Sequence, residues 1–320
     1  MTPAAPPDRR GGPLAGRAVH FAIVLAVFGC LAWADAVGFL AARPAWWLLP
    51  VAAALAVAGA DEVARLVAAR GAAVPAWLLR PATAAVVIAA AAGGDAFAAV
   101  STPPATTAAL CWAAAAVALG MMAIFVTEIA GYSSRAGGDR GAALDRVAAG
   151  VLALVLVGLP LAFMVALRLL GGRGDGVGER AGGDPGIVPL LSLVAAAKGG
   201  DVAAFVVGSL FGRRRMAPAL SPGKTWEGAM ASLAGAVLAS WLVLARLGAG
   251  SGRGPAGGWL GYGLAIGVAA ICGDLAESLI KRECGAKDSG RTLGGLGGVL
   301  DLVDSFIFAA PVAWLLWVMG

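Results

Sequence analysis

The residues best suited to chemistry lie near the end of the chain, between Gly273 and Ser305. In an otherwise apolar, alanine-rich sequence, this stretch concentrates charged side chains: Asp274, Glu277, Lys281, Arg282, Lys287, Asp288, Asp301 and Asp304. A glycine-rich run, Gly294–Gly298, separates the last two aspartates from the other charges. Carboxylates bind Mg²⁺, basic side chains bind phosphate, and glycines let the backbone approach a ligand closely. We interpret the stretch as a site for a metal and a nucleotide.

A second polar group interrupts an apolar run as Lys198-Gly-Gly-Asp201. Charges within a membrane span are costly, so they face a cavity or each other. Two interpretations stay open: a self-neutralising pair at i,i+3 packed between helices, or a pair lining a hydrophilic cavity. The two glycines permit close approach of another helix or of a ligand.

A third run, Ser221–Gly228, reads SPGKTWEG. Ser221, Lys224 and Thr225 offer groups that bind phosphate oxygens, and the helix expected after them offers its N-terminal N–H groups. The spacing is not that of a Walker A loop, because Pro218 stands where the first glycine belongs. Glu227 suits the first turn of the following helix.

The composition indicates what must position these groups. Of 320 residues, 60% are hydrophobic and 13% are charged, and the mean hydropathy is +0.84. A soluble protein could not cover that much apolar side chain, so we predict an all-α polytopic integral membrane protein. A single histidine and four scattered cysteines argue against a zinc site.

About nine apolar segments have the length of roughly 20 residues that crosses a bilayer. We place them at 18–41, 45–62, 82–100, 105–130, 147–169, 187–210, 226–247, 257–280 and 299–319. We divide the chain into a disordered cytoplasmic tail, N-terminal transmembrane helices and a C-terminal catalytic transmembrane region, at 1–17, 18–186 and 187–320.

The distribution of positive charge orients these segments. Of the 24 Lys and Arg residues, 17 fall in alternate connections that start with the N-terminal tail, and 6 fall in the other set. The positive-inside rule then places the N-terminus in the cytoplasm and the C-terminus outside. Asp274 and Glu277 would lie at the inner end of the eighth segment, and Asp301 and Asp304 in the first turns of the ninth. We therefore expect four carboxylates to converge at the cytoplasmic face.

The motifs together resemble those of the CDP-diacylglycerol synthases, also called phosphatidate cytidylyltransferases. The resemblance runs from Ile187 to the C-terminus, and the earlier residues match only as a set of spans. It is carried, in the family's order and spacing, by Lys198–Asp201, Ser221–Gly228, Gly273–Arg282, Lys287–Gly290 and Asp301-Leu-Val-Asp304.

The resemblance implies transfer of a cytidylyl group from CTP to phosphatidate in phospholipid biosynthesis, with CDP-diacylglycerol and pyrophosphate as products. It implies Mg²⁺ as cofactor, with a second cation such as K⁺ as an option, and a homodimer in the cytoplasmic (inner) membrane. The active site would face the cytoplasm and membrane lipid would surround the enzyme. Nothing in the charge distribution indicates nucleic acid as a partner.

For the reaction that the resemblance implies, the ligand preferences of Mg²⁺ and of phosphate suggest roles for the residues. The metal ligands would be Asp274 and Asp301, then Asp304 and Glu277. The catalytic set would be Asp274, Asp301, Lys281 and Lys287. The substrate-binding set would be Lys198, Asp201, Ser221, Lys224, Thr225, Glu227, Arg282 and Asp288.

Three positions differ from the family pattern: Gly294 stands where the family has Pro, Leu296 where it has His and Leu302 where it has Arg. Three alternatives stay open. One is a diverged or non-catalytic relative, one is a CTP-dependent enzyme that acts on an isoprenoid lipid, and one is an ion-coupled transporter, for which Lys198 and Asp201 would line the path.

Overall fold

Long runs of alanine, leucine and valine form helices here, because a backbone within a membrane must satisfy its own hydrogen bonds. The computed structural model describes residues 48–71, 73–97, 105–132, 142–170, 187–248, 254–290 and 297–320. Seven helices among them are long and apolar enough to cross a membrane. The prediction of an all-α polytopic membrane protein is confirmed.

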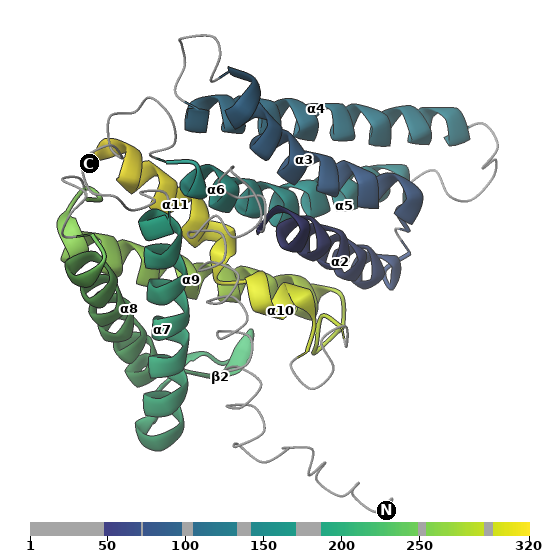
Figure 1. Cartoon of the computed structure of the whole chain (residues 1–320). Coiled ribbons are helices and arrows are strands. Elements are labelled where there is room, and N and C mark those ends of the chain that lie inside the picture. Colours follow the sequence, from purple (N-terminus) through teal and green to yellow (C-terminus); the bar gives the residue numbers. More distant parts are fainter. Residues whose placement is uncertain are drawn as a thin grey trace, which may run out of the picture.

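The helices form two groups that meet along the middle of the molecule (Figure 1). The first group consists of α2 (Leu48–Ala68), α3 (Ala76–Phe97), α4 (Ala105–Tyr132), α5 (Ala142–Ala153), a short π-helical turn η1 (Leu154–Gly158) and α6 (Leu159–Arg168). The second consists of α7 (Ile187–Phe211), a hairpin of β1 (Arg215–Ala217) and β2 (Ser221–Thr225), α8 (Trp226–Arg246), α9 (Gly258–Glu283), α10 (Val299–Val303) and α11 (Phe306–Met319).

The last seven of the nine predicted segments correspond to the seven candidate spans. The second segment forms α2, which is not among those candidates since its C-terminal half carries Asp61, Glu62 and Arg65. The first segment and the N-terminal tail lie outside the described residues. The count of nine and the side of the N-terminus therefore stay predictions.

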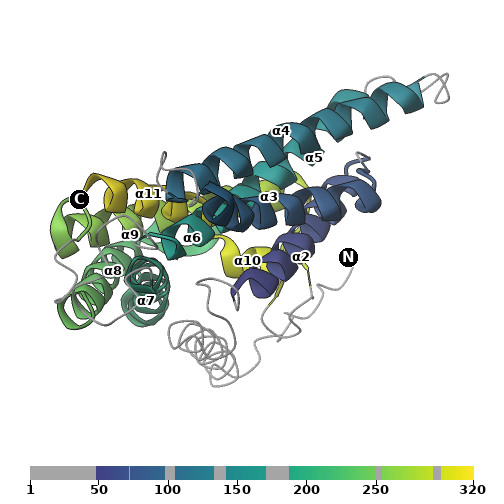
Figure 2. The same ribbon diagram turned by 45° about the horizontal axis from the view of Figure 1, so that its top comes forward.

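Helices α7 and α8 lie side by side in both views (Figures 1 and 2). Small residues allow this: a Cβ at Gly199 would lie 3.0 Å from the Ala239 Cβ, and one at Gly200 would lie 2.9 Å from the Ser232 Oγ. The glycines of the Lys198–Asp201 motif thus admit another helix. The antiparallel β1–β2 hairpin, in which Arg215 pairs with Thr225, connects the ends of the two helices.

The predicted ninth segment is one apolar run but not one continuous helix. It divides at Asp304 and Ser305, between α10 and α11. Helix α9 crosses this break at Gly273, where any Cβ would collide with the carbonyl oxygen of Asp304. The missing side chain therefore brings the backbone of α9 against the break and places Asp274 beside Asp304.

Candidate active site

Helix α9 presents one charged face. Asp274, Glu277 and Lys281 follow one another at three and four residues, so they share a side of the helix. Their position near its C-terminal end is unfavourable for carboxylates, because the helix dipole is negative there. Neighbouring cations must therefore compensate.

Three carboxylates converge at this face of α9. Asp274 and Glu277 of α9 and Asp304 of the α10–α11 break each offer an oxygen, and these oxygens all lie within 4.8 Å of one another. Glu277 is only 1% exposed, and its Oε1 atom has no hydrogen-bond partner. Mg²⁺ prefers oxygen ligands, and an unpaired buried carboxylate oxygen is costly. These residues fit a hard divalent cation.

Each of the three carboxylates has a lysine nearby, and the three lysines come from three elements: β2, α9 and α7. Lys224 Nζ of β2 lies 2.7 Å from Asp274 Oδ2, and Lys281 Nζ of α9 lies 2.7 Å from Glu277 Oε2. Lys198 Nζ of α7 lies 3.7 Å from Asp304 Oδ1.

These lysines also contact Asp201 and Asp301, at 3.0 and 2.7 Å. With every group ionised, the network holds five carboxylates against three ammonium groups, a formal excess of two negative charges. A divalent cation among them would neutralise it.

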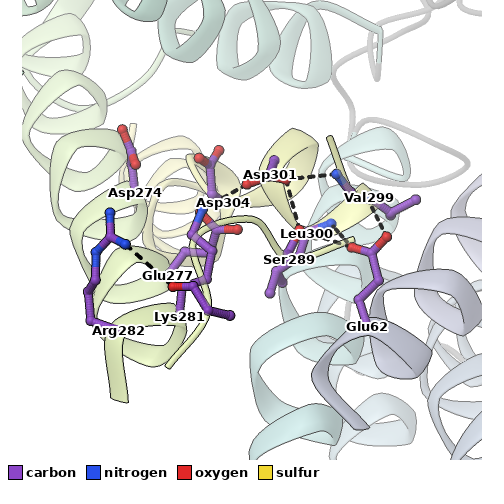
Figure 3. Close-up of polar contacts among 12 residues, drawn as sticks. Glu62, Asp274, Glu277, Lys281, Arg282, Ser289, Val299, Leu300, Asp301 and Asp304 are labelled. Atoms are coloured by element: carbon purple, nitrogen blue, oxygen red, sulfur yellow. Dashed lines mark hydrogen bonds and ion pairs between the residues drawn. The ribbon is translucent and has the colours of Figure 1, made fainter. Parts of the chain in front are cut away.

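Asp301, predicted as a first metal ligand, has other partners. Its Oδ1 accepts a 2.7 Å hydrogen bond from Lys281 Nζ. Its Oδ2 accepts bonds of 2.8 Å from Ser289 Oγ and 2.7 Å from the Gly298 backbone N–H. Figure 3 shows Asp301 on the far side of Asp304 from Asp274. The structure thus brings all four predicted carboxylates into one network but groups Asp274, Glu277 and Asp304 most closely.

Lys198 and Asp201 combine both interpretations of their motif. Lys198 is buried and donates to Asp201 Oδ2 at 3.0 Å and to Ser305 Oγ at 2.5 Å. The pair is self-neutralising, yet it also connects α7 to the break beside Asp304. Asp201 in turn lines a cavity.

That cavity has a volume of about 630 Å³ and lies among α7, the hairpin, α8 and α9. Its polar lining includes Asp201, Lys224, Thr225 and Asp274, and its apolar lining includes Phe205, Met216 and Ile271. It therefore joins part of the charged network to an apolar wall.

Several predicted substrate-binding residues make structural contacts. Thr225 Oγ1 accepts the Gly228 N–H at 3.1 Å and caps α8. Glu227 accepts backbone N–H groups of Arg213 and Arg214. Arg282 Nε donates to the Leu220 carbonyl at 3.1 Å and so fastens the hairpin to α9.

The remaining predicted site residues are not members of the charged network. Ser221 is half-buried at the start of β2. Lys287 and Asp288 are exposed in the turn that follows α9. Of the glycine-rich run, Gly294, Gly295 and Leu296 lie outside the described residues.

Sequence reasoning missed Glu62. This residue of α2 is fully buried, and its carboxylate accepts the backbone N–H groups of Val299 and Leu300 at 2.9 and 2.8 Å (Figure 3). One signal was present, since a carboxylate at the end of an apolar run needs an explanation. Its contact with Arg65, at 3.9 Å, is local. Its hydrogen-bond partners on α10 are more than 200 residues away, however, and no local pattern indicates them.

The sequence is similar to that of known proteins. The sequence model of the cytidylyltransferase family matches residues 17–319. A phosphatidate cytidylyltransferase of Brucella suis biovar 1 (strain 1330) is 41% identical over 131 residues, which are 41% of this chain and 47% of that protein.

Two further relatives have similar identity. A phosphatidate cytidylyltransferase of Pseudomonas aeruginosa PAO1 is 38% identical over 144 residues, or 41% of this chain and 48% of that protein. The uncharacterized protein YnbB of Escherichia coli K12 is 42% identical over 133 residues, or 40% of this chain and 41% of that protein. The chain therefore spans less than half the length of each relative.

Proposed function

The chain belongs to the cytidylyltransferase family, and we propose that it transfers a cytidylyl group from CTP to phosphatidate, giving CDP-diacylglycerol and pyrophosphate. The observation that carries this proposal is the charged network at the cavity wall. Its three lysines suit phosphate groups, and its two excess negative charges suit a divalent cation. Two relatives that bear the name phosphatidate cytidylyltransferase support the choice of acceptor.

Asp274, Glu277 and Asp304 would hold Mg²⁺, with Asp301 beside them. The metal, when bound, offsets negative charge on the α-phosphate and on the departing pyrophosphate. This need is strong because both reactants are anions.

The chain's own residues bring the anions together. The phosphate of phosphatidate attacks the α-phosphorus of CTP, and the bond from that phosphorus to pyrophosphate breaks. A phosphate monoester is largely ionised at pH 7, with a second pKa of about 6, so it needs little help from a base. Lys224 reaches into the cavity from the hairpin, and Lys281 flanks Glu277 from α9. Each offers N–H donors to phosphate oxygens.

Lipid access follows from the cavity wall. Phe205, Met216 and Ile271 line the same space as Lys224 and Asp274. The apolar wall and part of the charged network thus adjoin within one cavity, so a headgroup can reach Lys224 while the acyl chains stay in the bilayer.

An assay of the purified protein tests the activity. We expect CDP-diacylglycerol when the protein is supplied with labelled CTP, Mg²⁺ and phosphatidate, and no product when the metal is chelated. Isoprenoid phosphates are supplied in place of phosphatidate in a parallel assay. Product with these lipids alone would indicate a CTP-dependent enzyme that acts on an isoprenoid lipid. Absence of product with every lipid phosphate would favour the transporter or the non-catalytic relative.

We propose that the chain lies in the cytoplasmic membrane with the hairpin and the carboxylates facing the cytoplasm, as the positive charges of its connections favour. Alkaline phosphatase, which is active only outside the cytoplasm, is then expected to work when fused after Gly320. It is expected to be inactive when fused to a truncation that ends at Leu220. Inactivity of the first fusion together with activity of the second would contradict this orientation.

A further inference from the structure

Glu62 is a buried carboxylate that belongs to none of the motifs of the site. It lies in α2, in the N-terminal half of the chain, and is fully inaccessible to solvent. A buried carboxylate is tolerated only where hydrogen bonds replace water. Glu62 finds them on α10, since its Oε1 accepts from Val299 N at 2.9 Å and its Oε2 from Leu300 N at 2.8 Å. Its charge also favours the N-terminal end of that short helix.

The surrounding glycines leave room for this carboxylate. A Cβ at Gly290 would lie 2.7 Å from Glu62 Oε1, and a Cβ at Gly298 would collide with Glu62 Oε2 and Ser289 Oγ. Gly297 has a φ of 93°, a left-handed conformation that other residues adopt at a cost. The turn before α10 is thus shaped around a side chain from a distant helix.

Glu62 is also connected to Asp301. The hydroxyl of Ser289 lies 2.8 Å from Asp301 Oδ2 and 3.3 Å from Glu62 Oε2, so it stands between the two carboxylates. Gly298, whose N–H donates to Asp301 Oδ2 at 2.7 Å, directly precedes the two residues that Glu62 binds. Asp301 in turn holds Lys281, which contacts Glu277 of the carboxylate cluster.

We propose that Glu62 is a positioning residue for the active site: by binding the N-terminus of α10, it sets the place of Asp301 and, through Asp301, of Lys281. It touches neither substrate in this proposal. The N-terminal helices are then part of the catalytic apparatus, because α2 holds the segment on which Asp301 stands (Figure 3). This inference rests on the proposed function for its kinetic readout but not for its structural one.

Glu62→Gln is the informative change, because it keeps the size of the side chain and replaces one acceptor oxygen with an NH₂ group. The NH₂ group would face a backbone N–H of α10, so two hydrogen-bond donors would meet and one hydrogen bond would be lost. We expect kcat to fall at least tenfold, about 1.4 kcal/mol of barrier, while the KM for CTP changes less than twofold. We expect faster amide hydrogen exchange in peptides that cover Val299–Val303. Glu62→Asp, which keeps both acceptor oxygens, should recover part of kcat and of the protection.

A matched control separates positioning from general stability. Glu128 is also a buried carboxylate of the N-terminal half, and it pairs with Arg146 at 2.9 Å between α4 and α5. Glu128→Gln should lower the melting temperature but leave kcat and the exchange of Val299–Val303 unchanged. If Glu62→Gln behaves in the same way as this control, the proposal is overturned.

Two further arms keep the test decisive. If Glu62→Gln does not fold, Ser289→Ala removes the hydroxyl between Glu62 and Asp301 and should still lower kcat severalfold. A normal kcat in Ser289→Ala would then contradict the proposal. If the wild-type protein makes no CDP-lipid, the proposed function fails, and hydrogen exchange alone decides whether Glu62 fixes α10.

Discussion

Asp304→Asn is expected to lower cytidylyl transfer by about a hundredfold or more while leaving the protein folded. Asp304 lies with Asp274 and Glu277 in the group whose oxygens approach within 4.8 Å. The amide keeps the size of the side chain but removes a charge from the proposed metal site. Metal stabilisation of phosphoryl transfer is worth several kcal/mol, and each ~1.4 kcal/mol is a factor of ten in rate. Lys198 keeps Asp201 as a partner at 3.0 Å, so no buried ammonium is left unpaired.

The measurement is turnover as a function of Mg²⁺ concentration, beside thermal melts with and without Mg²⁺. Asp304→Asn and Asp274→Asn should both raise the Mg²⁺ concentration needed for half-maximal turnover and reduce the stabilisation that Mg²⁺ gives. Asp61→Asn is the control, since Asp61 forms a 2.9 Å ion pair with Arg80 in the N-terminal helices and should retain normal metal dependence. Unchanged metal dependence in Asp304→Asn and Asp274→Asn would show that the metal does not bind to this group of carboxylates.

The convergence of the carboxylates could be predicted from the sequence, but their grouping could not. Asp274 and Glu277 share a face of α9 by their spacing alone. Asp301 and Asp304 have the same spacing, but the structure gives them different partners. Asp304 lies beside Gly273 of α9 and Lys198 of α7, whereas Asp301 binds Lys281 and Ser289. These partners lie on other elements, and the spacing of the two aspartates does not indicate them.

Long-range pairing also explains what else was missed. The SPGKTWEG run predicted a phosphate loop before a helix; its first five residues form β2 and its last three begin α8. The pairing of its Lys224 with Asp274 depends on the hairpin folding back beside α9, where Arg282 holds the Leu220 carbonyl. The role of Glu62 depends on α2 reaching α10. Periodicity and spacing indicate elements and faces, but they do not specify which distant faces meet.

Lys281→Met is expected to have the second largest effect, on stability as well as on turnover. Lys281 Nζ lies 2.7 Å from both Glu277 Oε2 and Asp301 Oδ1. Its side chain is 13% exposed and that of Glu277 is 1% exposed. Removing the cation leaves two carboxylates facing one another, and removing one partner of a buried ion pair costs about 3–5 kcal/mol. The ammonium has three N–H donors and uses two here, so the third can bind a substrate phosphate. We therefore expect a lower melting temperature and a turnover reduced by at least tenfold.

The double variant Lys281→Met, Asp301→Asn tests how Asp301 acts. If Asp301 serves by holding Lys281, its carboxylate has no further function once Lys281 is gone. Asp301→Asn should then lower turnover in the wild-type background but not in the Lys281→Met background, and it should restore part of the lost stability by removing a repelling charge. If Asp301 binds the metal directly, as its place in the sequence motif predicts, Asp301→Asn should lower turnover further in both backgrounds and shift the Mg²⁺ dependence. Turnover and melting temperature of the wild type, the two single variants and the double variant distinguish these outcomes.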